Sequence, residues 1–109
     1  MESSYTPFIY NDVIYKDSKF TRVISEIGHD ITNSVFSGIV FNRATGATVA
    51  TFSTTKDAPN FKFKYYLVFA TCAALDVQIC EYVVYETDAA SEPQIMIAGK
   101  MEIKAKGSD

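Results

Sequence analysis

The sequence reads NFKFKYYLVFATCAALDVQICEYVVYET over residues 60–87, and the rest of the chain is organised around this stretch. Its first half has apolar residues at every second position, namely Phe61, Phe63, Tyr65, Leu67 and Phe69. Successive side chains of a strand point to opposite faces, so the alternation predicts a strand with one apolar face. Residues 79–85 form a second strand, rich in aromatic and β-branched residues. The segment 70–75 between them contains helix formers and predicts one short helical corner.

The bulk composition indicates one domain with a substantial core. The chain has 109 residues, of which 48% are hydrophobic and 14% aromatic, so it can bury a core without disulfides. Ten basic and 13 acidic residues give a net charge of −3, which argues against a nucleic-acid partner. No apolar run approaches the roughly 18 residues of a membrane span, and we therefore expect no membrane partner.

The first residues and the cysteines bear on where the protein works. The N-terminus lacks the basic and apolar regions of a signal peptide, so we expect synthesis and use without secretion. In a reducing cytoplasm two cysteines usually stay thiols, and Cys72 and Cys80 are predicted to be buried and free.

The remaining segments predict an all-β protein. Residues 1–11, with Tyr5, Phe8 and Tyr10 around Pro7, are typical of an N-terminal arm, and residues 105–109 of a flexible tail. Gly46 marks a hairpin turn. Further strands are expected at 12–15, 20–27, 34–43, 48–54 and 94–104. About seven short strands at regular spacing favour an antiparallel β-sandwich over residues 12–104, with a barrel as the second possibility.

Residues that carry chemistry are few and scattered. His29 lies in a Gly-His-Asp turn with no second His or Cys at ligand spacing, so a solvated turn residue is favoured over a metal ligand or proton shuttle. Four aspartates fall in predicted turns, where they bond to their own backbone: Asp17, Asp30, Asp57 and Asp88. A nucleophile needs a base and an orienting group, and one histidine does not supply a triad. We therefore expect no enzyme activity, no metal and no cofactor.

Five segments form a recognisable series: Ile14–Phe20, Asp30-Ile-Thr-Asn33, Cys72-Ala-Ala-Leu75, the Tyr-rich strand Cys80–Asp88 and Gly99-Lys-Met-Glu-Ile103. In this order they resemble small immunoglobulin-like domains of tailed-bacteriophage virion proteins, of the upper-baseplate N-terminal and the fibre or head-attachment type. The sequence departs from the pattern in having Asn33 in place of Gly and 76–78 in place of Pro-Gly. The resemblance covers about residues 12–104, and it implies an immunoglobulin-like sandwich that serves as a structural part of a virion assembled in the host cytoplasm.

Aligning these motifs with the sequence predicts which residues point inward. The expected core consists of Phe36, Gly38, Val40, Phe63, Tyr65, Leu67, Leu75, Cys80, Tyr82, Val84, Ile97, Met101 and Ile103. On two strands the residues of the opposite parity, which point outward, are also apolar. A strand with one solvated face should instead alternate between apolar and polar residues. These outward residues are Val35, Ile39, Phe41, Ile79, Val83 and Tyr85. Covering loops or scattered exposed apolar residues are the ordinary explanation, and an assembly interface is the alternative that we favour.

The resulting hypothesis is a non-enzymatic structural protein of a phage particle. We expect docking onto capsid, neck, tail or fibre components through the outward residues, with Tyr5, Phe8 and Tyr10 of the arm added. The expected partners are other virion proteins, in a homo-oligomer or another symmetric assembly. The alternative is a ligand-binding β-sandwich, for example a carbohydrate-binding module. Most aromatic residues lie in strands, and the chain has no Trp, which favours the first hypothesis.

Overall fold

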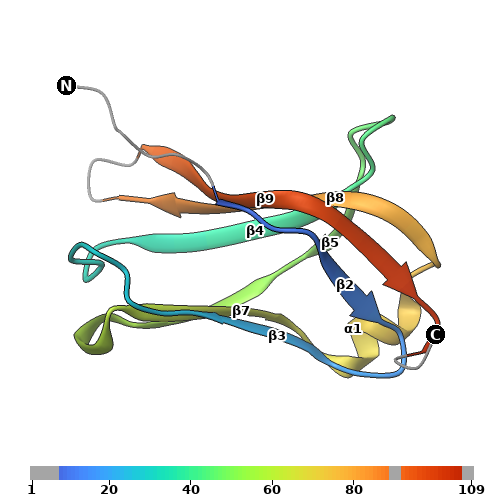
Figure 1. Cartoon of the computed structure of the whole chain (residues 1–109), viewed down its shortest axis with the longest axis horizontal. Helices are drawn as coiled ribbons and strands as arrows, with labels where there is room; N and C mark the ends of the chain where they lie inside the picture. Colours follow the sequence, from blue (N-terminus) through green and yellow to red (C-terminus); the bar gives the residue numbers. More distant parts are fainter. Residues whose placement is uncertain (1–7, 89–91, 107–109) are drawn as a thin grey trace.

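The computed structural model describes residues 8–88 and 92–106, which form two packed β-sheets. The larger sheet contains β9 (Pro93–Lys104), β8 (Gln78–Thr87), β4 (Val35–Phe41) and β5 (Thr48–Thr51) in that order, with β1 (Phe8–Ile9) and β2 (Asp12–Tyr15) along β9. The smaller sheet has the order β3 (Phe20–Ile24), β7 (Lys62–Leu67) and β6 (Ser53–Asp57). Figure 1 shows the two layers edge-on, with β9, β8 and β4 above β7 and β3. The all-β, immunoglobulin-like sandwich is therefore confirmed.

The core has the composition that the alternation predicts. Each expected inward residue is buried, including Tyr65 at 1% exposure and Val40 and Met101 at 0%. The rings of Phe36 and Phe63, from opposite sheets, stack with their centroids 3.8 Å apart. Aromatic side chains thus join the two layers, and such pairs add to the free energy of simple area burial.

The short helix α1 (Phe69–Ala74) carries the chain from β7 in the smaller sheet to β8 in the larger one. Its position agrees with the helical corner expected at 70–75. Cys72 is its buried residue, and Leu75 after it is 8% exposed. Cys72 and Cys80 are both free and buried, as predicted. Burial raises the pKa of both thiols, because the charged thiolate is disfavoured in an apolar surrounding.

The stretch at 48–54 is not one strand, as the sequence predicts, but two strands in different sheets. The chain leaves β5 at Thr51 and enters β6 at Ser53, so Phe52 is the residue at which it changes layer. The ring of Phe52 is 5% exposed and lies 5.0 Å from Tyr65, 5.7 Å from Phe20 and 6.2 Å from Tyr82, measured between centroids. Burial of Phe52 between the layers is the physical reason for the break, since a continuous edge strand would leave it in one sheet.

The N-terminal segment also differs from its prediction, because residues 8–11 belong to the larger sheet. Phe8 pairs with Ile97 and Ile9 with Ala98, both in parallel orientation, although no strand is expected before residue 12. Beyond them, the backbone N–H of Tyr10 donates to the carbonyl of Ala98, and Asn11 Oδ1 accepts from the N–H of Lys100, each at 2.9 Å. The sandwich thus begins at Phe8 within the described residues, which include no part of 1–7.

The backbones of the N-terminal segment and of β9 come close together at Gly99. A Cβ atom at Gly99 would lie 2.2 Å from the carbonyl oxygen of Tyr10. Only glycine fits at this distance, because real Cβ atoms do not approach a backbone oxygen so closely. The close approach separates β1 from β2 and fixes where the N-terminal segment lies.

Candidate protein interface

The outer face of the larger sheet carries apolar side chains on three strands, interrupted by Ser37 on β4 and Glu81 on β8. The strand register places Ile39 of β4 beside Val83 of β8, and Val83 beside Ala98 of β9. Tyr85 pairs with Ile95 in the same way. We define the outer face by these residues and their neighbours of the same parity: Val35, Ile39, Phe41, Ile79, Val83, Tyr85, Ile95 and Ala98.

Exposure on the outer face is uneven. Val35 is 65% exposed, Ile79 66% and Ile95 39%, whereas Ile39, Phe41 and Tyr85 are half-buried. The expectation that Val83 is exposed is wrong, since only 7% of it is accessible. Val83 points outward but lies in a central strand, and its direct partners Ile39 and Ala98 cover it from both sides. Alternation along one strand does not show which residues of the neighbouring strands cover a side chain.

A row of charged groups crosses the outer face between Val83 and Ile79 of β8. The guanidinium of Arg43 lies 2.6 Å from a carboxylate oxygen of Glu81, which pairs with Phe41 on one side and Lys100 on the other. Arg43 is 80% exposed, so this ion pair contributes little to stability. Charges of both signs therefore separate Ile79 from the other apolar side chains of the outer face.

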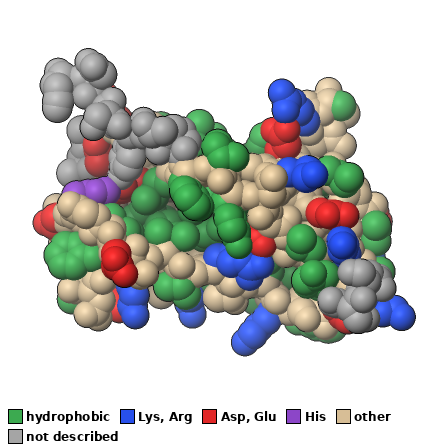
Figure 2. All heavy atoms as spheres, viewed as in Figure 1, with side chains coloured by type: hydrophobic (Ala, Val, Ile, Leu, Met, Phe, Trp, Pro, Cys, Tyr) green, Lys and Arg blue, Asp and Glu red, His purple; other side chains and the backbone are tan. Residues whose placement is uncertain are grey.

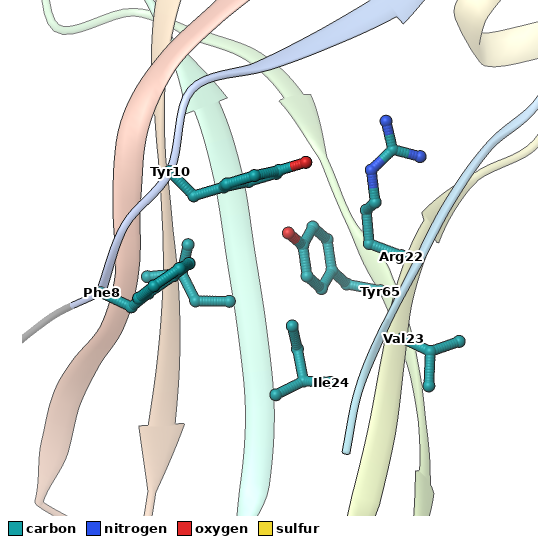
Figure 3. Close-up of a pocket in the computed structure, with 7 residues that line it drawn as sticks. Phe8, Tyr10, Arg22, Val23, Ile24 and Tyr65 are labelled. Atoms are coloured by element: carbon teal, nitrogen blue, oxygen red, sulfur yellow. The ribbon is translucent and has the colours of Figure 1, made fainter. Parts of the chain in front are cut away.

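A cleft of about 200 Å³ opens between the two sheets on the side where β1 and β3 form their edges. Figure 2 shows hydrophobic side chains gathered in the middle of this face. The cleft is lined by Phe8, Tyr10, Arg22, Val23, Ile24, Tyr65 and Ile97. In Figure 3 Phe8 and Tyr10 lie on one side of it and β3 on the other, with the ring of Tyr65 between them.

The predicted arm residues are therefore divided among different places. Phe8 is 63% exposed and Tyr10 44%, and their rings stack with centroids 6.0 Å apart at the cleft. Ile9, which the sequence analysis does not single out, is 68% exposed and takes the outward parity of its partner Ala98. Tyr5 lies outside the described residues. The arm thus contributes to the inner side of the sheet through Phe8 and Tyr10, not to the outer face.

An ion pair closes the sandwich beside the cleft. Arg22 of β3 donates from Nε and Nη2 to the two carboxylate oxygens of Asp12 in β2, at 2.8 and 2.6 Å. Asp12 is 7% exposed, and its bond raises the pKa of Arg22 further above the ordinary value. Because the pair joins β2 to β3, it links the edges of the two sheets and leaves the cleft open on one side of the link.

Two buried tyrosines, Tyr82 and Tyr65, connect the N-terminal segment to the core. Tyr82 donates its hydroxyl to the carbonyl of Tyr10 at 2.6 Å, and it shares a hydrogen bond with Tyr65. Burial, the largest cause, raises the pKa of Tyr65 to about 12 and also raises the pKa of Tyr82. Both phenols therefore stay protonated at neutral pH and keep their donor hydrogens.

These raised pKa values predict a loss of stability in alkali. The unfolded-state pKa of tyrosine is about 10, so the stabilisation by the neutral phenols is complete below pH 10 and is lost as the pH rises toward 12. Tyr65→Phe should remove a hydrogen bond, at a cost of about 1 kcal/mol at neutral pH, and make the alkaline decline shallower. Urea unfolding across this pH range measures both effects. An equally steep decline in the variant would contradict the assignment to Tyr65.

A second polar cluster lies around Glu86, at the end of the sandwich opposite α1. Glu86 is 3% exposed and accepts a hydrogen bond from Ser34 Oγ at 2.5 Å. His29 Nε2 lies 2.9 Å from both Glu86 carboxylate oxygens. His29 lies in a bend with its side chain 43% exposed, as expected of a solvated turn residue, but the contact with Glu86 is not predicted. The overlooked signal is parity, because Glu86 continues the inward series Cys80, Tyr82 and Val84, and a buried carboxylate needs a partner.

The order in which the three side chains contact one another determines what chemistry this cluster can perform. Ser34 bonds to Glu86, and so does His29, so the carboxylate lies between the hydroxyl and the imidazole. A serine nucleophile requires the histidine beside its hydroxyl, and Ser34 is only 5% exposed. The arrangement acts as a structural tie between the segment 29–34 and β8. Within residues 8–88 and 92–106, no three His, Cys, Asp or Glu side chains gather as a metal site.

Comparisons with known proteins do not name a family. No protein-family model matches the chain, and no curated protein does. Among solved structures, an internalin-like protein of Listeria monocytogenes aligns with a TM-score of 0.46 and 13% identity. The alignment covers 92% of this chain and 28% of the length of that protein. A likeness of this strength establishes no shared function, and the resemblance to phage virion domains stays a prediction.

None of the helices in the described part of the chain is both long enough and apolar enough to cross a lipid bilayer.

Proposed function

We propose that the chain is a non-enzymatic structural protein of a phage particle that docks onto capsid, neck, tail or fibre components. The outer face and the N-terminal segment are the docking surfaces. The observation that supports this proposal is the contrast in exposure between outward-facing and inward-facing residues on the neighbouring strands β4 and β8. Val35 and Ile79 are 65% and 66% exposed, while the adjacent Phe36 and Cys80 are 5% and 2% exposed. Large apolar side chains in this position favour contact with another protein.

The docking mechanism is burial of the apolar side chains that lie on both sides of the Arg43–Glu81 ion pair. Half-buried Ile39, Phe41 and Tyr85 surround the already covered Val83, so the centre of the outer face is rigid before a partner arrives. Rigid aromatic and aliphatic anchors lose little conformational entropy on binding. Stable interfaces bury about 1,200–2,000 Å² in total, which this sheet can supply only with a partner that covers several strands.

The resemblance of the sequence motifs to phage virion domains, over residues 12–104, supports docking within a virion. The elements that carry it occupy packing positions: the corner containing Cys72, the Tyr-rich strand β8, and the segment at Gly99 that the N-terminal backbone approaches closely. These residues shape the sandwich, and the outer face is left to the partner.

A carbohydrate-binding or other ligand-binding module has less support. The cleft measures about 200 Å³, below the roughly 300–1,000 Å³ of small-molecule pockets. Its rings also pack against one another, since Phe8 stacks on Tyr10. Binding of the isolated chain to a glycan array would nevertheless favour this alternative over docking.

Charge substitutions on the outer face should reduce incorporation into particles. Val35→Lys and Ile79→Lys each place an ammonium group on the docking surface, and we expect at least about a tenfold loss. Each variant is produced together with the tagged wild type in cells that assemble the particles, and the incorporated ratio is measured by mass spectrometry. Val68→Lys is the matched control, because Val68 is 53% exposed but precedes α1 at the smaller sheet. Equal incorporation of all three variants would contradict the proposal.

A further inference from the structure

Two cations lie beside one carboxylate in the charged row that crosses the outer face. Glu81 of β8 has Phe41 of β4 opposite it on one side and Lys100 of β9 on the other. Arg43, two residues after β4, bonds to Glu81 through Nη1, at 2.6 Å. Two cations therefore share a single carboxylate, and the row carries one positive charge in excess.

The ammonium group of Lys100 has no anionic partner within residues 8–88 and 92–106. Lys100 is exposed and directly opposite Glu81, close enough for an ion pair between neighbouring strands. None of the ion pairs in this part of the chain includes Lys100. Glu102, two residues further along β9 on the same face, is half-buried and forms no ion pair with it either. The charge of Lys100 is therefore left for solvent or for a partner.

The guanidinium of Arg43 also has donors to spare. An arginine carries several N–H donors in a planar fork, and the bond to Glu81 uses only the one at Nη1. Arg43 is 80% exposed, and Figure 1 shows its β4–β5 hairpin rising above the larger sheet, on the side away from the smaller one. A second carboxylate suits such a fork best, because it can accept two parallel hydrogen bonds.

We propose that the outer face binds a partner protein that presents an aspartate or glutamate side chain among apolar residues, and that this carboxylate lies between Arg43 and Lys100. The inference rests on the proposed docking and names the chemistry of the partner. Apolar residues of the partner cover Ile39 and Ile79, which lie on either side of the charged row.

The charge of the row determines the sign of the partner. A purely apolar partner would remove water from Arg43 and Lys100 without replacing it, which costs free energy. A basic partner would be repelled by Lys100, because Arg43 already neutralises Glu81. An acidic side chain restores the balance of two cations and two carboxylates, and such complementarity provides specificity between proteins.

The inference is tested by competition for incorporation into particles, against tagged wild type made in the same cells. Arg43→Gln and Lys100→Gln each remove one cation, and we expect the incorporated ratio to fall at least about fivefold. Glu81→Gln frees the guanidinium of Arg43 for the partner, so the ratio should not fall. Lys64→Gln is the matched control and should leave the ratio unchanged, because Lys64 is exposed on the smaller sheet.

A double variant separates partner binding from simple loss of the ion pair. If Arg43 only neutralises Glu81, Arg43→Gln combined with Glu81→Gln should be incorporated like the wild type. If Arg43 binds the carboxylate of the partner, the double variant should stay at least about fivefold below Glu81→Gln. Urea unfolding should give the wild-type midpoint for every variant, since exposed ion pairs contribute little to stability.

The pattern of losses distinguishes this inference from the docking itself. Normal incorporation of Val35→Lys would contradict docking through the outer face, and the acidic partner with it. Depletion of Val35→Lys with unchanged ratios for Arg43→Gln and Lys100→Gln would leave docking in place and overturn the acidic partner. Higher ratios for these two variants would also overturn it, because they would indicate a basic partner. If Lys100→Gln lowers the urea midpoint, Lys100→Arg against Lys100→Glu decides in its place, and equal incorporation of these two would contradict the inference.

Discussion

Phe52→Ala is expected to lower the free energy of unfolding by about 3–5 kcal/mol, the usual cost of truncating a buried aromatic side chain. Phe52 lies where the chain passes from one sheet to the other, and its ring contacts Phe20, Tyr65 and Tyr82. These partners come from both sheets, so the cavity cannot collapse by the movement of one strand. Urea or thermal unfolding measures the difference directly.

The neighbouring Thr51→Ala serves as the control for Phe52→Ala. Thr51 is exposed at the end of β5, and its substitution should change the free energy of unfolding by less than about 0.5 kcal/mol. If Phe52→Ala costs no more than Thr51→Ala, the crossover between sheets does not depend on this ring, and the account of the β5–β6 break is wrong.

Gly99→Ala is expected to destabilise the protein by about 2–3 kcal/mol, although alanine is ordinarily tolerated better than glycine within a strand. The added Cβ would lie 2.2 Å from the carbonyl oxygen and 2.7 Å from the carbonyl carbon of Tyr10, so the N-terminal segment must move away. The bond from Tyr82 to Tyr10 and the bond from Lys100 to Asn11 would then be lost. Unfolding free energy and amide hydrogen exchange at Lys100 measure the two consequences.

Gly28→Ala is the matched control for Gly99→Ala. No atom lies within 4 Å of a Cβ at Gly28, and its backbone does not have a positive φ. The stability should therefore change by less than about 0.5 kcal/mol. Fast hydrogen exchange at Lys100 in Gly99→Ala, with slow exchange in Gly28→Ala, would locate the effect at the close approach of the N-terminal segment to β9. Equal behaviour of the two variants would show that residues 8–11 do not depend on the close approach.

The predictable part of the fold follows from local patterns. Alternation at Phe63, Tyr65 and Leu67 gives the inner face of β7, and the positive φ of 75° at Gly46 agrees with the hairpin expected there. The helical corner follows from a run of helix formers too short for a long helix. Each of these features is determined within a few residues, so the sequence alone identifies it.

The unpredicted part depends on contacts between distant segments. The strand break at Phe52 results from rings that come from both sheets. The parallel pairing of Phe8 and Ile9 depends on Gly99, about ninety residues later. His29 meets Glu86 across 57 positions, and a single turn motif gives no sign of this contact. At the candidate interface, alternation correctly predicts that Val35 and Ile79 are exposed, but it cannot show that β8 is central and that Val83 is covered.

The central claim is most directly tested by quantitative mass spectrometry of phage particles purified from the cells that make this protein. The account predicts that the chain is an integral component with a fixed copy number per particle, retained after density-gradient purification. Hundreds of copies would indicate capsid decoration, and six or twelve a neck or baseplate position. Absence of the chain from purified particles would contradict the structural role.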